Sequence, residues 1–198
     1  MRTHIALIIA APLLVMLAGC STGSPSPTDA PSSPSATAQA TTLEPCDLVT
    51  AAEASHLSGV TFGPGESEVT GTTAAGKRCT YGSQTKNVFF VQVASAASAA
   101  DAQAQWTSEE AELDADIAQA LPPGVNATTT KTDVSGLGDK AATGTVSQVI
   151  EGQTININVI YVLKGANLLA FGDTTVNAPA ASVADLTTQA AISLARMP

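Results

Sequence analysis

Three cysteines carry the most defined chemistry in this chain, because a thiol can be acylated, paired in a disulfide or bound to a metal ion. They are Cys20, Cys46 and Cys79. Cys46 and Cys79 lie 33 positions apart and are left as a pair if Cys20 is modified. Outside the cytoplasm such a pair is most simply a disulfide. The alternative is a metal pair, which lacks further ligands because His56 is the only histidine after Cys20.

Cys20 is the last residue of an N-terminal segment, residues 1–20, that indicates the cellular location of the chain. Arg2 and His4 precede an apolar run over residues 5–17, and Ala18-Gly19 stand directly before Cys20. A short positive start, a short apolar run and small residues before a cleavage point are typical of a secretory signal. A membrane-spanning helix needs about 20 apolar residues, more than this run provides.

The four residues 17–20, Leu-Ala-Gly-Cys, also resemble a bacterial lipobox, in which the cysteine sulfur is acylated and the chain is cut just before it. The alternative is an ordinary secretory signal with an incidental cysteine. We expect residues 1–19 to be a lipoprotein signal peptide and Cys20 to carry lipid. The chain is then anchored by acyl chains to the extracytoplasmic face of the cell membrane.

The charge of the mature chain excludes one class of partner. Removing Arg2 with the signal leaves seven Lys and Arg against 17 Asp and Glu, a net charge of −10. Nucleic acid is excluded as a partner, because its phosphates demand Lys and Arg. No polybasic patch flanks Cys20, so attachment to the membrane must come from lipid rather than from charge.

A change in composition near residue 43 divides the mature chain. Residues 20–42 are rich in Ser, Thr, Pro and Ala and hold almost no large apolar side chain. Such a segment cannot bury enough surface to offset its ordering entropy, so we expect a disordered tether. Residues 43–198 then form a single domain.

A set of carboxylates shares one face of a helix predicted over residues 98–121. Glu109, Glu112 and Asp116 stand at positions i, i+3 and i+7, so they lie on one side of that helix. The plain interpretation is a solvated acidic face. The functional one is a docking surface for a cationic partner or for divalent ions. Calcium is disfavoured because an oxygen-ligand site usually needs a loop with a glycine turn, and we expect no metal or cofactor.

The elements that must position these residues form an α+β domain. A Thr50–Glu53 capping box starts a short helix over 51–58 that ends at Gly59, and Pro179 fits the first turn of a last helix. Alternating apolar residues predict strands over 77–81, 87–94, 128–134, 142–150, 154–163 and 168–173, with an edge strand or loop within 60–76. We expect an antiparallel sheet of about six strands, packed by the two longer helices, with the short N-terminal helix tied by the disulfide.

The strand over 154–163 has two different faces. One carries Ile155, Ile157 and Val159, while Asn156 and Asn158 begin the other, which we expect to be solvated at the start of the strand. The predicted core of the domain is Leu57, Phe89, Val91, Trp106, Leu113, Ile117, Ile157, Val159, Leu169, Leu186 and Leu194.

Together these pieces resemble an actinobacterial cell-envelope lipoprotein family of unknown function. The resemblance rests on the lipobox, the Ser/Thr/Pro tether, the Pro-Cys-Asp-Leu-Val-Thr entry at residues 45–50, the Cys-Thr-Tyr strand at 79–81 and the glycine turn at 134–141. It covers most of residues 43–198. It implies the same location and fold and a disulfide between Cys46 and Cys79, and it adds no catalytic residue.

Three functions remain open at this point. The first is a non-catalytic, surface-anchored module that binds an envelope protein or a small ligand. The second is a carboxylate-dependent cell-wall hydrolase, which needs two facing carboxyls about 5–9.5 Å apart; the acid pairs Glu66 with Glu68 and Glu109 with Glu110 are its candidates. The third is a structural accessory that holds an envelope complex together through the acidic helix. We expect the first, and therefore no enzyme.

Overall fold

A computed structural model describes residues 43–70, 76–83, 86–108 and 128–197. The predicted signal peptide and tether lie outside these residues. The predicted acidic face of Glu109, Glu112 and Asp116 does too, as does Glu110. Within the described residues, no helix is long and apolar enough to cross a membrane.

The fold is α+β, as expected. The helices are α1 (Pro45–Leu48), α2 (Ala51–Ser58) and α4 (Val183–Ala195), and residues 99–108 are also helical. The strands are β1 (Glu66–Thr70), β2 (Gly76–Gly82), β3 (Val88–Ser95), β4 (Thr128–Asp133), β5 (Lys140–Ile150), β6 (Gln153–Lys164) and β7 (Asn167–Val176).

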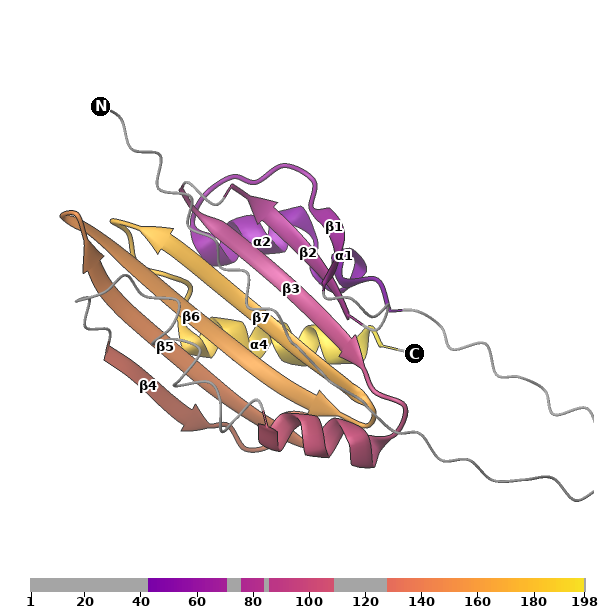
Figure 1. The fold of residues 1–198 in the computed structure, drawn as a ribbon. Helices are drawn as coiled ribbons and strands as arrows, with labels where there is room; N and C mark the ends of the chain where they lie inside the picture. Colours follow the sequence, from indigo (N-terminus) through magenta and orange to yellow (C-terminus); the bar gives the residue numbers. More distant parts are fainter. Residues whose placement is uncertain (1–42, 71–75, 84–85, 109–127, 198) are drawn as a thin grey trace, which may run out of the picture.

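In the described part of the chain, seven strands form one antiparallel sheet in the order β1-β2-β3-β7-β6-β5-β4, rather than the expected six or so (Figure 1). Two meanders, β1-β2-β3 and β4-β5-β6-β7, join where β3 pairs with β7, with Val91 opposite Phe171. The additional strand is β1, which takes the edge that we had predicted only as a strand or loop within residues 60–76.

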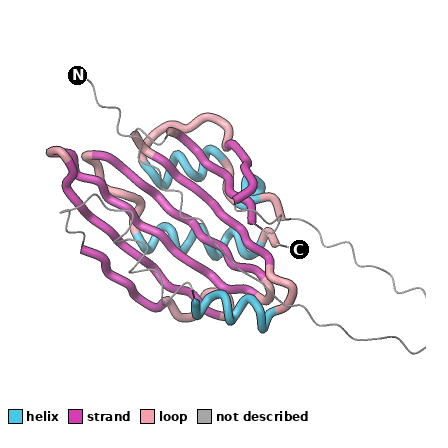
Figure 2. The backbone as a smooth tube through the Cα atoms, in the orientation of Figure 1, coloured by secondary structure: helices cyan, strands magenta, loops and turns pink. Residues whose placement is uncertain are grey.

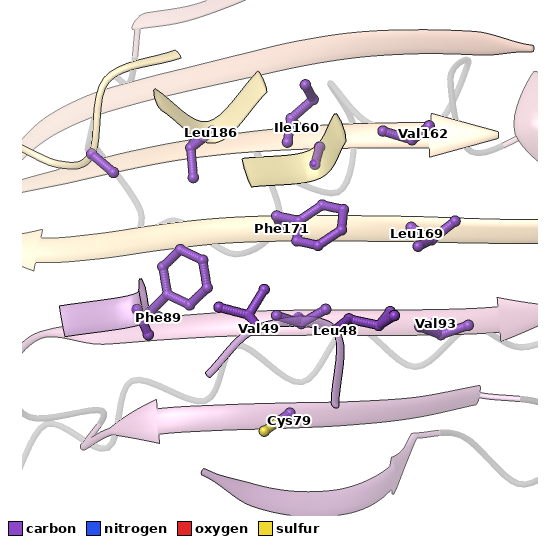
Figure 3. Close-up of a cluster of buried hydrophobic side chains, with 14 of the residues drawn as sticks. Leu48, Val49, Cys79, Phe89, Val93, Ile160, Val162, Leu169, Phe171 and Leu186 are labelled. Atoms are coloured by element: carbon purple, nitrogen blue, oxygen red, sulfur yellow. The ribbon is translucent and has the colours of Figure 1, made fainter. Parts of the chain in front are cut away.

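The helices cover the two faces of this sheet differently. One face carries Val91, Ile160 and Phe171, all fully buried, and α1, α2 and α4 pack against it (Figures 1 and 3). We name this face the helical face. The second face carries a smaller cluster in which Ala102 and Trp106 of the 99–108 helix cover sheet residues. The two longer helices therefore lie on opposite faces, each burying its apolar stripe against a different side of the sheet.

Most of the predicted core is confirmed. Phe89, Val91, Trp106, Val159, Leu169 and Leu186 are buried. Leu57 and Leu194 are half-buried and pack against the main cluster, and Ile157 is half-buried. Leu113 and Ile117 lie outside the described residues.

The face of β6 that begins with Asn156 and Asn158 changes character along the strand. Ile160 and Val162, which share a face with Asn156 and Asn158, are fully buried in the main cluster. The two asparagines are themselves half-buried. At the start of the strand, where we expect a solvated face, the asparagines are partly covered because the chain that follows β7 returns over them.

The N-terminal helices are fixed as predicted, with one correction. Cys46 and Cys79 form a disulfide. Cys46 belongs to α1, however, so the bond ties this additional four-residue helix to β2 rather than tying α2 directly. The capping box of α2 is present: the Glu53 amide donates to Thr50 Oγ1 at 3.2 Å, and the Thr50 amide donates to Glu53 Oε2 at 2.8 Å.

The last helix begins later than predicted. α4 starts at Val183, with Ser182 as its N-cap accepting the Asp185 amide at 3.1 Å. A serine cap with an acidic residue three positions on satisfies the first-turn amides, so it sets the helix start more firmly than a proline can. Pro179 lies instead in the segment before the helix.

Candidate functional site

Of the predicted site residues, the structure brings together only the two cysteines. The Cys46–Cys79 disulfide is confirmed, and it removes both thiols from metal binding. Cys20, Glu109, Glu112 and Asp116 lie outside the described residues, so lipidation and the acidic surface stay predictions. Glu66 and Glu68 are exposed on the edge strand β1. They stand two positions apart on one side of the strand, opposite Thr80 and Arg78 of β2.

A recess lies between α2 and α4. It has a volume of about 370 Å³ and is bordered by Leu57 and Ile192 together with His56 and Asp185. Glu53 at its edge is already engaged, because Arg196 Nη2 lies 2.5 Å from its Oε1 and Nη1 lies 2.9 Å from its Oε2. Asp185, on the α4 side, accepts the Ser182 hydroxyl at 2.6 Å, so both carboxylates that border the recess already accept hydrogen bonds from within the chain.

The charge state of Glu53 follows from that pairing. The hydrogen bonds from Arg196 lower the pKa of Glu53 from its usual 4.5 to about 2, and bonds from Thr50 add to the effect while burial opposes it. Glu53 is therefore an ionised structural anchor between α2 and the end of α4 rather than a proton donor.

A second hollow is built around residues 177–182, which we name the crossover segment because they carry the chain from β7 back into α4 (Figures 1 and 2). Side chains of the sheet hold its backbone. Thr175 Oγ1 donates to the Ala178 carbonyl at 2.6 Å, and Asn156 Nδ2 donates to the same oxygen at 2.8 Å. Asn158 Nδ2 donates to the Ala181 carbonyl at 2.9 Å.

A buried carboxylate completes this attachment. Asp173 is fully buried; it accepts the Ala181 amide at 2.7 Å and the Ser58 hydroxyl at 2.6 Å. Burial raises the pKa of Asp173, and the bonds from Ser58 and Ala181 only partly offset that rise. Because the side chain is enclosed, it joins β7, α2 and the crossover segment and cannot reach a substrate.

Beside the crossover segment, the sheet and the segment together form a groove of about 520 Å³. We name it the polar groove. Its polar lining side chains are Thr130, Thr145, Ser147, Asn156 and Asn158, and its wall includes Pro179 and Ala180. Among the lining residues that the structure describes, none has an ionisable side chain.

The register places the five polar side chains in two rows. Thr130 of β4 pairs with Thr145 of β5, which pairs with Asn158 of β6. In the next row Ser147 pairs with Asn156. Paired residues project to the same face, so the groove floor is a grid of hydroxyls and amides on neighbouring strands.

Sequence reasoning missed this groove. Thr145 and Ser147 stand two positions apart in the sequence, as do Asn156 and Asn158, so each pair indicates a polar face of its strand. What the sequence did not show is that β4, β5 and β6 align these positions in register, or that the crossover segment walls them on one side. That requires long-range pairing, which no local pattern encodes.

Within the described part of the chain, no cluster of three or more His, Cys, Asp or Glu side chains could hold a metal ion. The chain matches no protein-family model, no curated protein and no solved structure. The resemblance to the actinobacterial lipoproteins therefore stays a prediction, and any function has to be argued from the groove and the sequence themselves.

Proposed function

We propose that the chain is a surface-anchored lipoprotein of the cell envelope, and that its folded domain binds a small envelope ligand or a partner without chemical turnover. The anchor is the lipid predicted on Cys20. The tether predicted over residues 20–42 would hold the domain about 25 Å from the bilayer on average.

The observation that carries the binding role is the polar groove. It is a walled recess lined by neutral hydroxyl and amide groups, of a volume that falls within the usual range for small-molecule sites. Such groups can orient a ligand through hydrogen bonds, but they do not form a pair that takes and returns a proton near neutral pH.

The engaged state of the acidic side chains near the two hollows supports the same role. Glu53 is paired with Arg196, and Asp173 is enclosed by Ser58 and the crossover segment. Both carboxylates hold elements of the fold together, and their oxygens accept hydrogen bonds from within the chain.

The anchor is tested by fractionation. Changing Cys20→Ala in the native host should move the chain from the membrane fraction to the soluble one and abolish incorporation of labelled palmitate. A Cys20→Ala chain that stays in the membrane with unchanged labelling would contradict the proposed anchor.

The absence of turnover is tested with a panel of glycosidase and peptidoglycan hydrolase substrates. We expect no turnover by the purified chain. Reproducible turnover that is lost in Glu66→Gln or Glu68→Gln, and retained in the exposed control Glu151→Gln, would replace binding with the carboxylate-dependent hydrolase.

A further inference from the structure

We propose that the polar groove binds an uncharged oligosaccharide. This inference rests on the proposed binding function and adds the chemical class of the ligand. It is carried by the lining chemistry, the hydrogen-bonding state of the lining groups and their arrangement on the sheet.

The lining selects for a ligand that is polar and neutral. Thr130, Thr145 and Ser147 offer hydroxyls, and Asn156 and Asn158 offer amides. An apolar ligand would leave these groups desolvated and unpaired, at a cost of about 1–3 kcal/mol for each group. An ionic ligand would find no opposite charge among them. A ligand rich in hydroxyls can both donate to and accept from such a surface.

Several of these groups remain available for a ligand. The Thr130 and Thr145 hydroxyls make no hydrogen bond within the part of the chain that the structure describes, and neither does Asn158 Oδ1. Asn156 Oδ1 accepts from Ser147 Oγ at 2.8 Å, which leaves the serine oxygen as an acceptor. The groove thus offers two free hydroxyls and at least two acceptor oxygens.

The crossover segment fixes the asparagines in advance. Because each amide nitrogen is bound to a crossover carbonyl, the two amide planes are held before a ligand arrives. A preorganised array loses little conformational entropy on binding, which is the main cost that a flexible polar surface pays.

The spacing of the grid suits a chain of sugar rings rather than a single small polyol. Neighbouring strands lie about 4.8 Å apart, and alternate residues along a strand lie about 6.6 Å apart. The five polar groups therefore extend over roughly 10 Å by 7 Å, on the scale of more than one ring. Pro179 and Ala180 give the wall apolar surface that the C–H faces of sugar rings can contact.

The test is a titration of the full mature-length chain bearing Cys20→Ser, with three neutral probes and one anionic control. The probes are chitotriose, maltotriose and cellotriose, and the control is trigalacturonate. Amide chemical shifts report where each binds. We expect at least one neutral probe to bind saturably with shifts centred on β4, β5, β6 and the crossover segment, and the anionic control to cause none there.

Variants at the groove make the site specific. Thr145→Val should weaken binding of that probe about 3- to 10-fold, the loss typical of one hydrogen bond, and Thr145→Ser should restore it. Thr80→Val, on β2 outside the groove, should leave the affinity unchanged. Unchanged melting temperatures would show that each variant is folded.

Three results would overturn the inference: no shift with any neutral probe, stronger binding of trigalacturonate at the groove, or equal affinity of Thr145→Val and the parent chain. If native mass spectrometry still shows a bound molecule that is not a saccharide, binding as such survives and only the ligand class is wrong. If native mass spectrometry shows no bound molecule and no probe binds, both the proposed binding function and the proposed ligand class are wrong.

Discussion

Asp173 shows how a polar residue in a β-strand can be structural. It lies fully buried between β7, the last residue of α2 and the crossover segment, with hydrogen-bond donors on both oxygens. Burial raises the pKa of Asp173 more than its two neutral hydrogen-bond donors, the Ser58 hydroxyl and the Ala181 amide, lower it. Ionisation of Asp173 therefore opposes folding.

The sign of the resulting pH dependence follows. The pKa of an unfolded aspartate is about 3.9, and that of folded Asp173 is higher. The stabilising contribution of protonated Asp173 is therefore complete below about pH 4 and is lost as pH rises through the folded pKa. Asp173→Asn keeps the shape and stays neutral, so its free energy of unfolding minus that of the parent should increase with pH above 4 and then level off.

Urea unfolding at a series of pH values measures that difference. Ser58→Ala is the matched variant: it removes one hydrogen bond to the carboxylate, so the loss of stability on raising the pH should become larger. A difference between Asp173→Asn and the parent that is constant with pH would show that Asp173 does not resist ionisation.

Gly138 and Gly136 provide a comparison within one turn. Both have positive φ, +62° and +79°, which side chains rarely adopt. A Cβ on Gly138 would lie 2.5 Å from the Leu163 carbonyl oxygen, whereas a Cβ on Gly136 would meet nothing within 4 Å. Gly136→Ala should lower the free energy of unfolding by about 1 kcal/mol for the backbone alone.

Gly138→Ala should cost about 1–3 kcal/mol more than Gly136→Ala, because the added methyl group also displaces the β6–β7 end of the sheet. Thermal unfolding of the two variants is the measurement. Equal losses of stability in the two variants would mean that the turn shifts to relieve the contact with Leu163 at no measurable cost.

At the scale of elements, α1 and α2 are held to the rest of the domain by contacts far apart in sequence. The Leu48 carbonyl accepts from Ser193 Oγ at 2.8 Å and from Arg196 Nη1 at 2.7 Å, and Tyr81 donates to the Val49 carbonyl. Arg196 also pairs with Glu53. The junction between the two short helices is therefore fixed from both β2 and α4.

The Glu53–Arg196 pair can be weighed by a double-mutant cycle. Glu53→Gln should lower the free energy of unfolding by about 1–2 kcal/mol at pH 7, since it weakens both the ion pair and the cap of α2. Arg196→Gln should remove the ion pair and the hydrogen bond to the Leu48 carbonyl, and leave the cap of α2 in place. The pKa of Glu53 is about 2 in the fold against a usual 4.5, so this contribution is present above about pH 4.5 and is lost as pH falls towards 2.

The coupling energy from the two single variants and the double variant isolates the pair from the cap. It should be favourable at pH 7 and fall towards zero as the pH drops through about 2. A coupling energy that is near zero at pH 7 would mean that the cap alone explains the effect of Glu53.

The disulfide also attaches α1 to the sheet, through β2. Replacing both Cys46 and Cys79 with alanine should lower the free energy of unfolding by about 2–4 kcal/mol, because the closed loop of 33 residues no longer restricts the unfolded chain. Urea unfolding measures the loss. A reducing agent should lower the stability of the parent to a similar extent and leave the double variant unchanged; a parent indifferent to reduction would contradict this account.

These elements also show what the sequence could predict. The capping box at Thr50–Glu53, the strand alternation and the glycine turns are local signals, and the structure contains all of them. The link between Glu53 and Arg196 spans 143 positions, and the pairing of β3 with β7 depends on which strands meet. Such contacts follow from packing of the whole chain, so local patterns could not place the polar groove.

At the scale of the whole molecule, one face of the sheet carries two environments. Its helical face holds the main core under α1, α2 and α4, and the polar groove opens on the same face where β4, β5 and β6 extend beside the crossover segment. The same asparagines that fasten the crossover segment line the groove. The groove is therefore complete only when the crossover segment lies against β6.

The central claim is that this domain holds a ligand at the envelope, and native mass spectrometry of the chain tests it most directly. The chain is purified in mild detergent from its own host, beside the variant Thr145→Val. The account predicts a bound molecule on the parent chain, released on denaturation and reduced in occupancy on Thr145→Val. A chain that carries only its lipid and one disulfide, with no adduct on either form, would contradict it.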